Sequence, residues 1–196
     1  MSGVQVRASG VGGSSATDLT NDAGAFTLGG SPTGNVTVVF SRDRCQGEVI
    51  FPDVTNNSLL TMEDVTFDCT GARPAKVSET FRGVIGNVPG SHQGNLTVCV
   101  FSGDTRRTRV VKLKDAVVED SNGTPTSFED LADGQLIEAF GDREGLGSSS
   151  ALDAETVKIL GAGNPDDCAA PSTPAPSATE TPSAEGTPEA TPSPTP

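Results

Sequence analysis

The chain contains no Trp, no Tyr and a single His among its 196 residues. Catalysis by a Ser or Cys nucleophile needs a neighbouring base. The lone imidazole, that of His92, lies between Pro89 and Gly94 in a segment with the composition of a surface turn. Sugar-cleaving sites also use flat aromatic side chains for stacking, and only eight Phe residues are present for that purpose and for the cores. We therefore predict that the chain is not an enzyme and has no catalytic residue and no cofactor.

Positively charged residues are scarce as well. The 13 Lys and Arg residues face 26 Asp and Glu residues, which gives a formal net charge of −13 at pH 7. Such a surface repels phosphate groups, so we predict that nucleic acid is not a partner. One basic cluster alternates with apolar residues and consists of Arg106, Arg107, Arg109, Lys112 and Lys114. Two interpretations of it are open, a solvated strand face and a patch for an anionic ligand, and we favour the solvated face.

Long apolar runs are missing too. No run approaches the roughly 18 residues that cross a bilayer, so we predict no transmembrane segment. A signal peptide would place a basic segment and then an apolar one after Met1, but Gly3 to Ser9 already alternates in the manner of a strand. This pattern by itself favours a cytoplasmic location.

The four cysteines favour the opposite location. Cys45, Cys69, Cys99 and Cys168 form no C-x-x-C pair, and with one His a tetrahedral zinc site would need all four of them from distant segments. Disulfides are the better interpretation, and of the three possible connectivities the domain organisation favours Cys45 with Cys69 and Cys99 with Cys168. Disulfides persist in oxidising compartments, so we predict an extracytoplasmic protein (periplasmic, cell-surface or secreted), with the cytoplasm as the alternative.

Two clusters of oxygen-bearing side chains are candidate sites, namely Asp18, Asn21 and Asp22 before Gly24, and Glu63, Asp64 and Asp68. The first cluster does not have the spacing of a calcium-binding EF-hand loop, and the same residues favour a hairpin turn for backbone reasons. The second would suit glycoside hydrolysis, but the aromatic platforms for a sugar are lacking. We therefore predict no metal site and no catalytic carboxylate pair.

Short alternating segments separated by Gly, Asn, Asp and Pro predict an all-β chain. Strands are expected at residues 3–9, 16–20, 25–28, 35–41, 48–51, 58–60, 65–69, 81–88, 95–102, 110–113, 116–119, 135–141 and 156–160, with one helical turn at 127–131. The polar segment from Thr70 to Lys76 is predicted to be a linker, which divides the chain into domains at 1–71 and 77–162. Residues 169–196, rich in Pro, Thr and Ser, are predicted to form a disordered tail that serves as a spacer or stalk.

The first domain resembles a known family. The segment from Thr17 to Leu28, followed by Pro32 to Val38, is similar to the "T-D-x-x-G-x-F-x-L … P-x-G" pattern of the carboxypeptidase regulatory-like (transthyretin-like) family. The resemblance covers about residues 3 to 70, with one or two extra residues between Asp18 and Gly24. It implies an Ig- or transthyretin-like β-sandwich. Members usually begin with a further Gly-rich strand, so the resemblance leaves open that the first strand is missing.

Three pieces of the second domain carry a further resemblance, namely Phe81 to Ile85, Phe128 to Leu131 with Gly134 before Leu136 to Gly141, and Leu152 to Val157. They are similar to the bacterial domain-of-unknown-function family 5666, which implies a small OB-like β-barrel. Their order and spacing carry the resemblance, which implies no active site.

Together these features favour a non-catalytic structural or interaction module of a bacterial cell envelope, with an unknown envelope protein or glycan as its partner. The alternative is a carbohydrate-binding module, an inference from fold analogy alone, because regulatory-like sandwiches are grouped with carbohydrate-binding-like folds.

Overall fold

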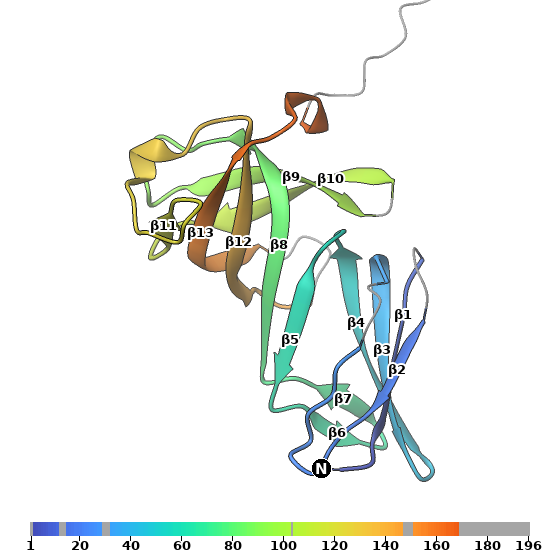
Figure 1. Cartoon of the computed structure of the whole chain (residues 1–196). Coiled ribbons are helices and arrows are strands. Elements are labelled where there is room, and N and C mark those ends of the chain that lie inside the picture. Colours follow the sequence, from blue (N-terminus) through green and yellow to red (C-terminus); the bar gives the residue numbers. More distant parts are fainter. Residues whose placement is uncertain (1, 12–14, 29–31, 103, 147–150, 169–196) are drawn as a thin grey trace, which may run out of the picture.

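The computed structural model describes residues 2–11, 15–28, 32–102, 104–146 and 151–168, and the predicted tail at 169–196 lies outside them. The described residues form thirteen strands and two short 3₁₀ helices, so the prediction of an all-β chain is confirmed (Figure 1). The strands are β1 (Gln5–Ser9), β2 (Ala16–Leu19), β3 (Gly34–Arg42), β4 (Cys45–Val54), β5 (Leu59–Glu63), β6 (Thr66–Asp68), β7 (Gly71–Arg73), β8 (Lys76–Asn87), β9 (Asn95–Ser102), β10 (Thr105–Lys112), β11 (Val117–Glu119), β12 (Gln135–Arg143) and β13 (Leu152–Ala162). The helices are η1 (Phe128–Asp130) and η2 (Pro165–Asp167).

The N-terminal sheet has the strand order β2-β1-β3-β4, and all its pairs are antiparallel. Every second side chain of its strands is buried, because successive residues of a strand point to opposite faces. The core on this face contains Val4, Val6, Ala8, Val36, Val38, Phe40, Val49, Phe51, Val54, Ala72 and Val77.

The second sheet closes on itself into a barrel of five strands. Its pairings run β10-β9-β8-β12-β13, and β10 then pairs with β13 in parallel through Val111 opposite Leu152. All other pairs of this ring are antiparallel. A second core fills the barrel and contains Phe81, Ile85, Leu96, Val98, Val100, Val111, Leu113, Val118, Leu131, Ile137, Ala139, Leu152, Ala154 and Val157. Leu96, Val98 and Val100, which are every second residue of β9, all lie in this core.

Strand β8 belongs to both parts of the molecule. It pairs with β5 through its first residues and with β9 and β12 further along, so it runs from the lower part to the upper part in Figure 1. Three alternate residues of its inner face meet three different surroundings. Val77 packs in the N-terminal core and Phe81 in the barrel core, and Glu79 lies buried between them. One continuous strand thus connects the two cores.

Two local predictions are wrong. Residues 25–28 form no strand, because the Asn21 Oδ1 and Asp18 carboxylate oxygens accept the N–H groups of Ala25 and Thr27 and hold this segment to its own turn. The predicted linker from Thr70 to Lys76 contains β7, which pairs with β6, and β8 begins at Lys76.

Gly141 of β12 provides a test of the barrel. It lies at a register shift against β13, and a Cβ atom added there would lie 2.1 Å from the Asp153 carbonyl oxygen. Gly141→Ala is expected to lower the free energy of unfolding by about 1–3 kcal/mol, because backbone must move to relieve the clash. Urea unfolding measures the change. Gly90→Ala, where an added Cβ meets nothing within 4 Å, is the control and is expected to have little effect.

Candidate functional site

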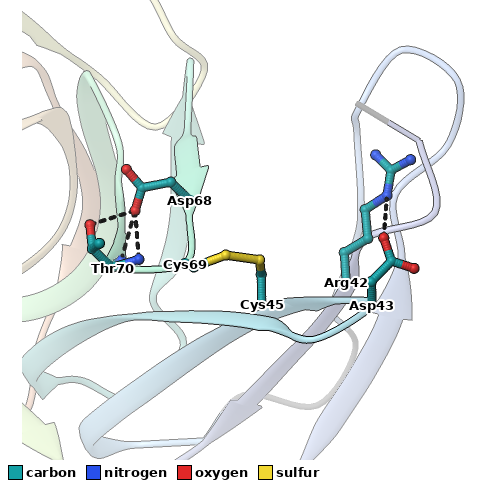
Figure 2. The surroundings of a disulfide bond; sticks show 7 residues. Arg42, Asp43, Cys45, Asp68, Cys69 and Thr70 are labelled. Carbon is teal, nitrogen blue, oxygen red and sulfur yellow. Dashed lines mark hydrogen bonds and ion pairs between the residues drawn. A yellow bond between two sulfur atoms is a disulfide. The ribbon is translucent and has the colours of Figure 1, made fainter.

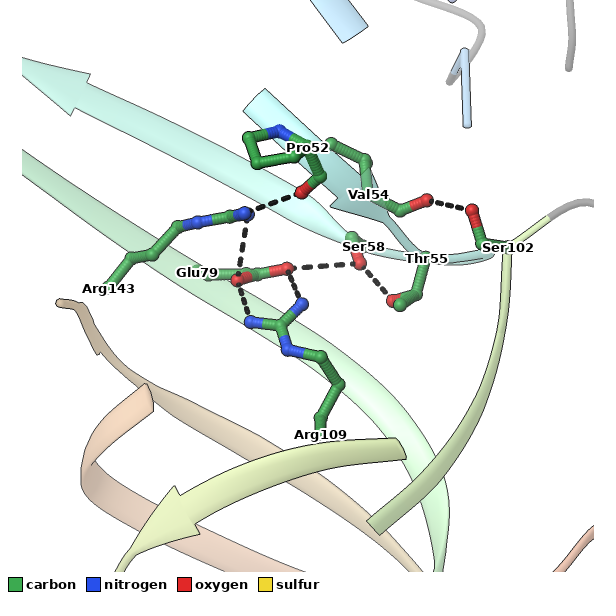
Figure 3. Close-up of polar contacts among 8 residues, drawn as sticks. All are labelled: Pro52, Val54, Thr55, Ser58, Glu79, Ser102, Arg109 and Arg143. Carbon is green, nitrogen blue, oxygen red and sulfur yellow. Dashed lines mark hydrogen bonds and ion pairs between the residues drawn. The ribbon is translucent and has the colours of Figure 1, made fainter. Parts of the chain in front are cut away.

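The most unusual polar feature of the molecule is a buried ionic cluster at the junction between the N-terminal sheet and the barrel (Figure 3). Glu79 of β8 is 0 % exposed. Its two carboxylate oxygens accept hydrogen bonds from the Arg109 guanidinium at 3.2 and 2.7 Å, and the second oxygen also accepts one from Arg143 Nη1 at 3.4 Å. The two arginines come from β10 and β12, so three barrel strands meet at one carboxylate.

The end of β4 and the segment that joins it to β5 reach into this cluster. The Pro52 carbonyl oxygen accepts a hydrogen bond from Arg143 Nη2 at 2.6 Å, and Ser58 Oγ donates to Glu79 Oε1 at 3.5 Å. Further along the junction, Ser102 Oγ donates to the Val54 carbonyl at 2.9 Å. We name residues 52–58 the junction turn. Its backbone and side chains contact β8, β9 and β12, which fixes the N-terminal sheet against the barrel.

The cluster contains two positive charges and one negative charge, and all three side chains are buried. Burial lowers the pKa of the Arg143 guanidinium, and the Glu79 carboxylate opposes that effect. Arg143 stays charged because guanidinium groups do not lose their proton in proteins. Its side chain lies over the Phe51 ring, 6.0 Å from guanidinium carbon to ring centroid, and the Arg109 side chain lies 5.0 Å from the Phe81 centroid. Each guanidinium group therefore contacts an aromatic ring and the Glu79 carboxylate.

The polar groups of the cluster bind mostly to one another. The hydroxyls of Thr55 and Ser58 are hydrogen-bonded to each other. The guanidinium groups of Arg109 and Arg143 direct bonded nitrogens at Glu79 and Pro52, whereas Arg143 Nε is buried without a hydrogen-bond partner among the described residues. This arrangement can hold the two β units at a fixed angle.

A second feature is an apolar cavity of about 630 Å³ beside the N-terminal sheet. Its floor is the buried face of β1, β3 and β4, and its walls are residues 23–28 and 58–62. Phe26, Leu60 and Met62 line it and are only partly buried. Asp64 is the single charged residue among the described residues that line the cavity.

No known family model, curated protein or solved structure matches this chain. Its function is therefore argued from the geometry of these two features.

The cysteines lie in two pairs. The structure joins Cys45 to Cys69, with Cα atoms 4.5 Å apart, and Cys99 to Cys168, with Cα atoms 5.4 Å apart. The first bond ties the start of β4 to the turn between β6 and β7 (Figure 2). The second ties β9 to the segment after η2. Both pairings are those that the sequence favoured, and no described cysteine is free.

The other candidate residues are not brought together. His92 is exposed, and its ring centroid lies 6.4 Å from that of Phe128. Asn21 Oδ1 accepts backbone N–H groups from Ala23 and Ala25, which is the turn that the sequence predicts there. Within the described residues, no group of three or more His, Cys, Asp and Glu side chains is arranged to hold a metal ion. No helix among the described residues has the length and apolar character to cross a bilayer.

The basic cluster is divided among acceptors of the chain itself, so the interpretation as a solvated strand face is wrong for Arg109, which is buried against Glu79. Arg106 donates to the Asp166 carbonyl, Arg107 lies 3.7 Å from Asp53, and Lys112 pairs with Glu144. Each of these four side chains therefore has an acceptor within the chain, while Arg107 and Lys112 stay partly exposed in agreement with the favoured solvated face.

Sequence reasoning missed the role of Glu79. The available signal was its position, because Val77, Glu79 and Phe81 alternate on one face of a strand. A charged residue at a position where apolar residues are expected indicates a buried ion pair. The identity of the partners had no local signal, because Arg109 and Arg143 lie 30 and 64 residues away.

Asp68 provides a pH-dependent test of the turn beside the first disulfide (Figure 2). Hydrogen bonds from the Thr70 hydroxyl and N–H lower the pKa of Asp68 below its ordinary 3.8. A lowered pKa means that the carboxylate stabilises the turn above about pH 4 and loses this effect as the pH falls through the folded-state pKa. We expect the Thr70 amide resonance in NMR spectra to shift with a midpoint below 3.8. The variant Asp68→Asn is expected to lack this transition, and a midpoint at or above 3.8 would contradict the assignment.

Proposed function

We propose that the chain is a non-catalytic structural or interaction module of a bacterial cell envelope, in which two β units serve as a rigid body of fixed shape. The observation that carries the proposal is the junction. A buried ionic cluster and a turn bonded to three barrel strands fix the relative orientation of the two units, an arrangement suited to a spacer or a docking platform. The two disulfides support an oxidising, extracytoplasmic location.

The rigidity can be tested by distance measurement in the full chain. Spin labels attached through a non-natural amino acid at Glu48 and Asn122, two exposed positions on different units, leave the disulfides intact. Pulsed electron resonance is expected to give one narrow distance distribution. A broad or bimodal distribution would show a flexible hinge and overturn the rigid-body part of the proposal.

The envelope role needs a separate measurement. The full chain is expected to cosediment with washed envelopes of the host bacterium and to be displaced by an excess of unlabelled chain, which a specific contact requires. A chain that is monomeric and stays in the supernatant at every concentration would count against the envelope role, whatever its rigidity.

We further propose that the barrel is OB-like and the N-terminal unit sandwich-like. The ring order β8-β9-β10-β13-β12, with one parallel pair, is the argument for the first assignment. In OB-folds the face of the second and third strands binds oligosaccharides or oligonucleotides, which favours a carbohydrate-binding module as the alternative function.

Two observations weigh against that alternative. The corresponding face lies on β9 and β10, and this chain's own segment after β13 contacts it. Cys168 forms a disulfide with Cys99, and the Asp166 carbonyl accepts a hydrogen bond from Arg106. The sequence also contains no Trp or Tyr for stacking on a sugar. A glycan array is expected to show no binding, and saturable binding of any glycan would favour the alternative.

A further inference from the structure

Backbone as well as side chains line the walls of the apolar cavity. Residues 23–28 and 58–62 line it without a gap in either series. A strand that met the cavity only through its side chains would contribute every second residue. The uninterrupted series therefore means that backbone of both segments, the edge of β5 and the turn at 22–24 with the residues after it, borders the space together with their side chains.

Both segments carry unused hydrogen-bonding groups. Strand β5 pairs with β8 along one edge, and no described strand pairs with its other edge. On the other wall, the N–H groups of Ala23 and Ala25 bond to the Asn21 side chain, and the N–H group of Thr27 bonds to the Asp18 carboxylate of β2. Within the described part of the chain, the N–H groups of Phe26 and Leu28 have no such partner.

We propose that the cavity binds an extended peptide strand, which adds to the free edge of β5 and places alternate aliphatic side chains against the partly buried apolar residues of the cavity walls. A peptide supplies donors and acceptors at the spacing of a strand, which is what an open edge recognises. The five residues of β5 offer roughly 17 Å of edge at the rise of a strand. Phe26, Leu60 and Met62, which are only partly buried, supply the apolar surface for its side chains.

The charge of Asp64 favours a basic residue at one end of the peptide. Asp64 lines the cavity just after β5 and has no cation among the ion pairs of the described residues. With the strongly acidic charge of the whole chain, this carboxylate favours a peptide with a Lys or Arg beside its aliphatic residues. The inference rests on the interaction role proposed above and names its partner.

The test uses a defined probe, an acetylated and amidated peptide of alternating Val and Thr with one terminal Lys, titrated into the isotope-labelled full chain. We expect saturable NMR shifts of the Leu60 and Met62 amides and slower hydrogen exchange there. Two matched peptides carry N-methyl groups on alternate residues. In the first peptide these groups block one hydrogen-bonding edge of the extended peptide, and in the second they block the other edge. One of the two sets is expected to weaken binding at least about 10-fold, because two or more hydrogen bonds are lost.

Three results would overturn the inference. They are an absence of binding, equal affinity for both N-methylated peptides and the parent, and binding of decanoate at the same residues in place of the peptide. The last outcome would identify the cavity as a site for apolar small molecules, which its volume also suits.

A variant locates the site. Met62→Lys places a charge on the cavity wall and is expected to weaken peptide binding at least about 10-fold, whereas Ile50→Lys, at a β4 residue that is 50 % exposed, is the matched control. If Met62→Lys does not fold, the N-methyl comparison on the natural chain decides. In the natural chain, absence of peptide binding together with envelope cosedimentation would refute this inference alone, and peptide binding without cosedimentation would refute the envelope role alone.

Discussion

Replacing Glu79 with Gln is expected to lower the free energy of unfolding by about 3–5 kcal/mol. The substitution keeps the size of the side chain but removes the one carboxylate that Arg109 and Arg143 share in the ion pairs of the described residues. Arg109 then remains buried without its ion-pair partner and Arg143 keeps only the smaller attraction of Asp53, and burial of a poorly compensated charge is among the most costly changes in a protein. Urea unfolding of the full chain, followed by circular dichroism, measures the change.

The matched control is Glu138→Gln. Glu138 pairs with Arg82 at 2.8 Å, but the two side chains are 31 % and 57 % exposed. An exposed pair contributes at most about 1 kcal/mol, so this variant is expected to have a small effect. If Glu79→Gln changed stability no more than Glu138→Gln does, the junction would not depend on its buried charges.

A triple variant separates the cost of unpaired charge from the loss of an attraction. Glu79→Leu combined with Arg109→Met and Arg143→Met removes all three charges together. Because burying an ion pair costs nearly as much as its attraction returns, this variant is expected to be more stable than Glu79→Gln. The spin-label distances then decide whether the charges also fix the orientation of the two units, since a stable triple variant with a broadened distribution would assign them that role.

Removing the Cys99–Cys168 disulfide is expected to have an effect of similar size. The two residues are 69 positions apart, and the bond restricts the unfolded chain more strongly when the loop is longer. In the chain-entropy model, Cys99→Ala with Cys168→Ala lowers the free energy of unfolding by about 4 kcal/mol. Alanine is the suitable replacement because Cys99 is buried in β9, where a hydroxyl would lack a partner.

The Cys45–Cys69 pair is the internal comparison. Its residues are 24 positions apart, and the same model gives about 3 kcal/mol for Cys45→Ala with Cys69→Ala. The longer loop is therefore expected to cost about 1 kcal/mol more. A reducing agent is expected to lower the free energy of unfolding of the natural chain to a value close to that of the variants. If both double variants had the same free energy of unfolding as the natural chain, the sulfurs would not be bonded in solution.

Much of the strand pattern follows from the sequence. Val36, Val38 and Phe40 alternate within the segment 35–41, and this segment lies inside a strand of the structure. The predicted segments 95–102 and 135–141 also lie inside strands. Residues 25–28 have the same alternation of Phe26 and Leu28, yet they form no strand, because Asn21 and Asp18 compete for their N–H groups. Local pattern is a reliable guide only where no side chain offers the backbone a nearer partner.

The sequence by itself determined that the chain is built of strands, because alternation and turn residues are local properties. It also favoured the pairing of the four cysteines. Only the tertiary structure decided that Arg109 is buried instead of solvated, and that β8 passes from one core into the other. The cavity beside β5 likewise has walls from two distant segments. Each of these features depends on contacts between residues far apart in the chain, and the energy of such contacts is set by burial and by partners that no local pattern specifies.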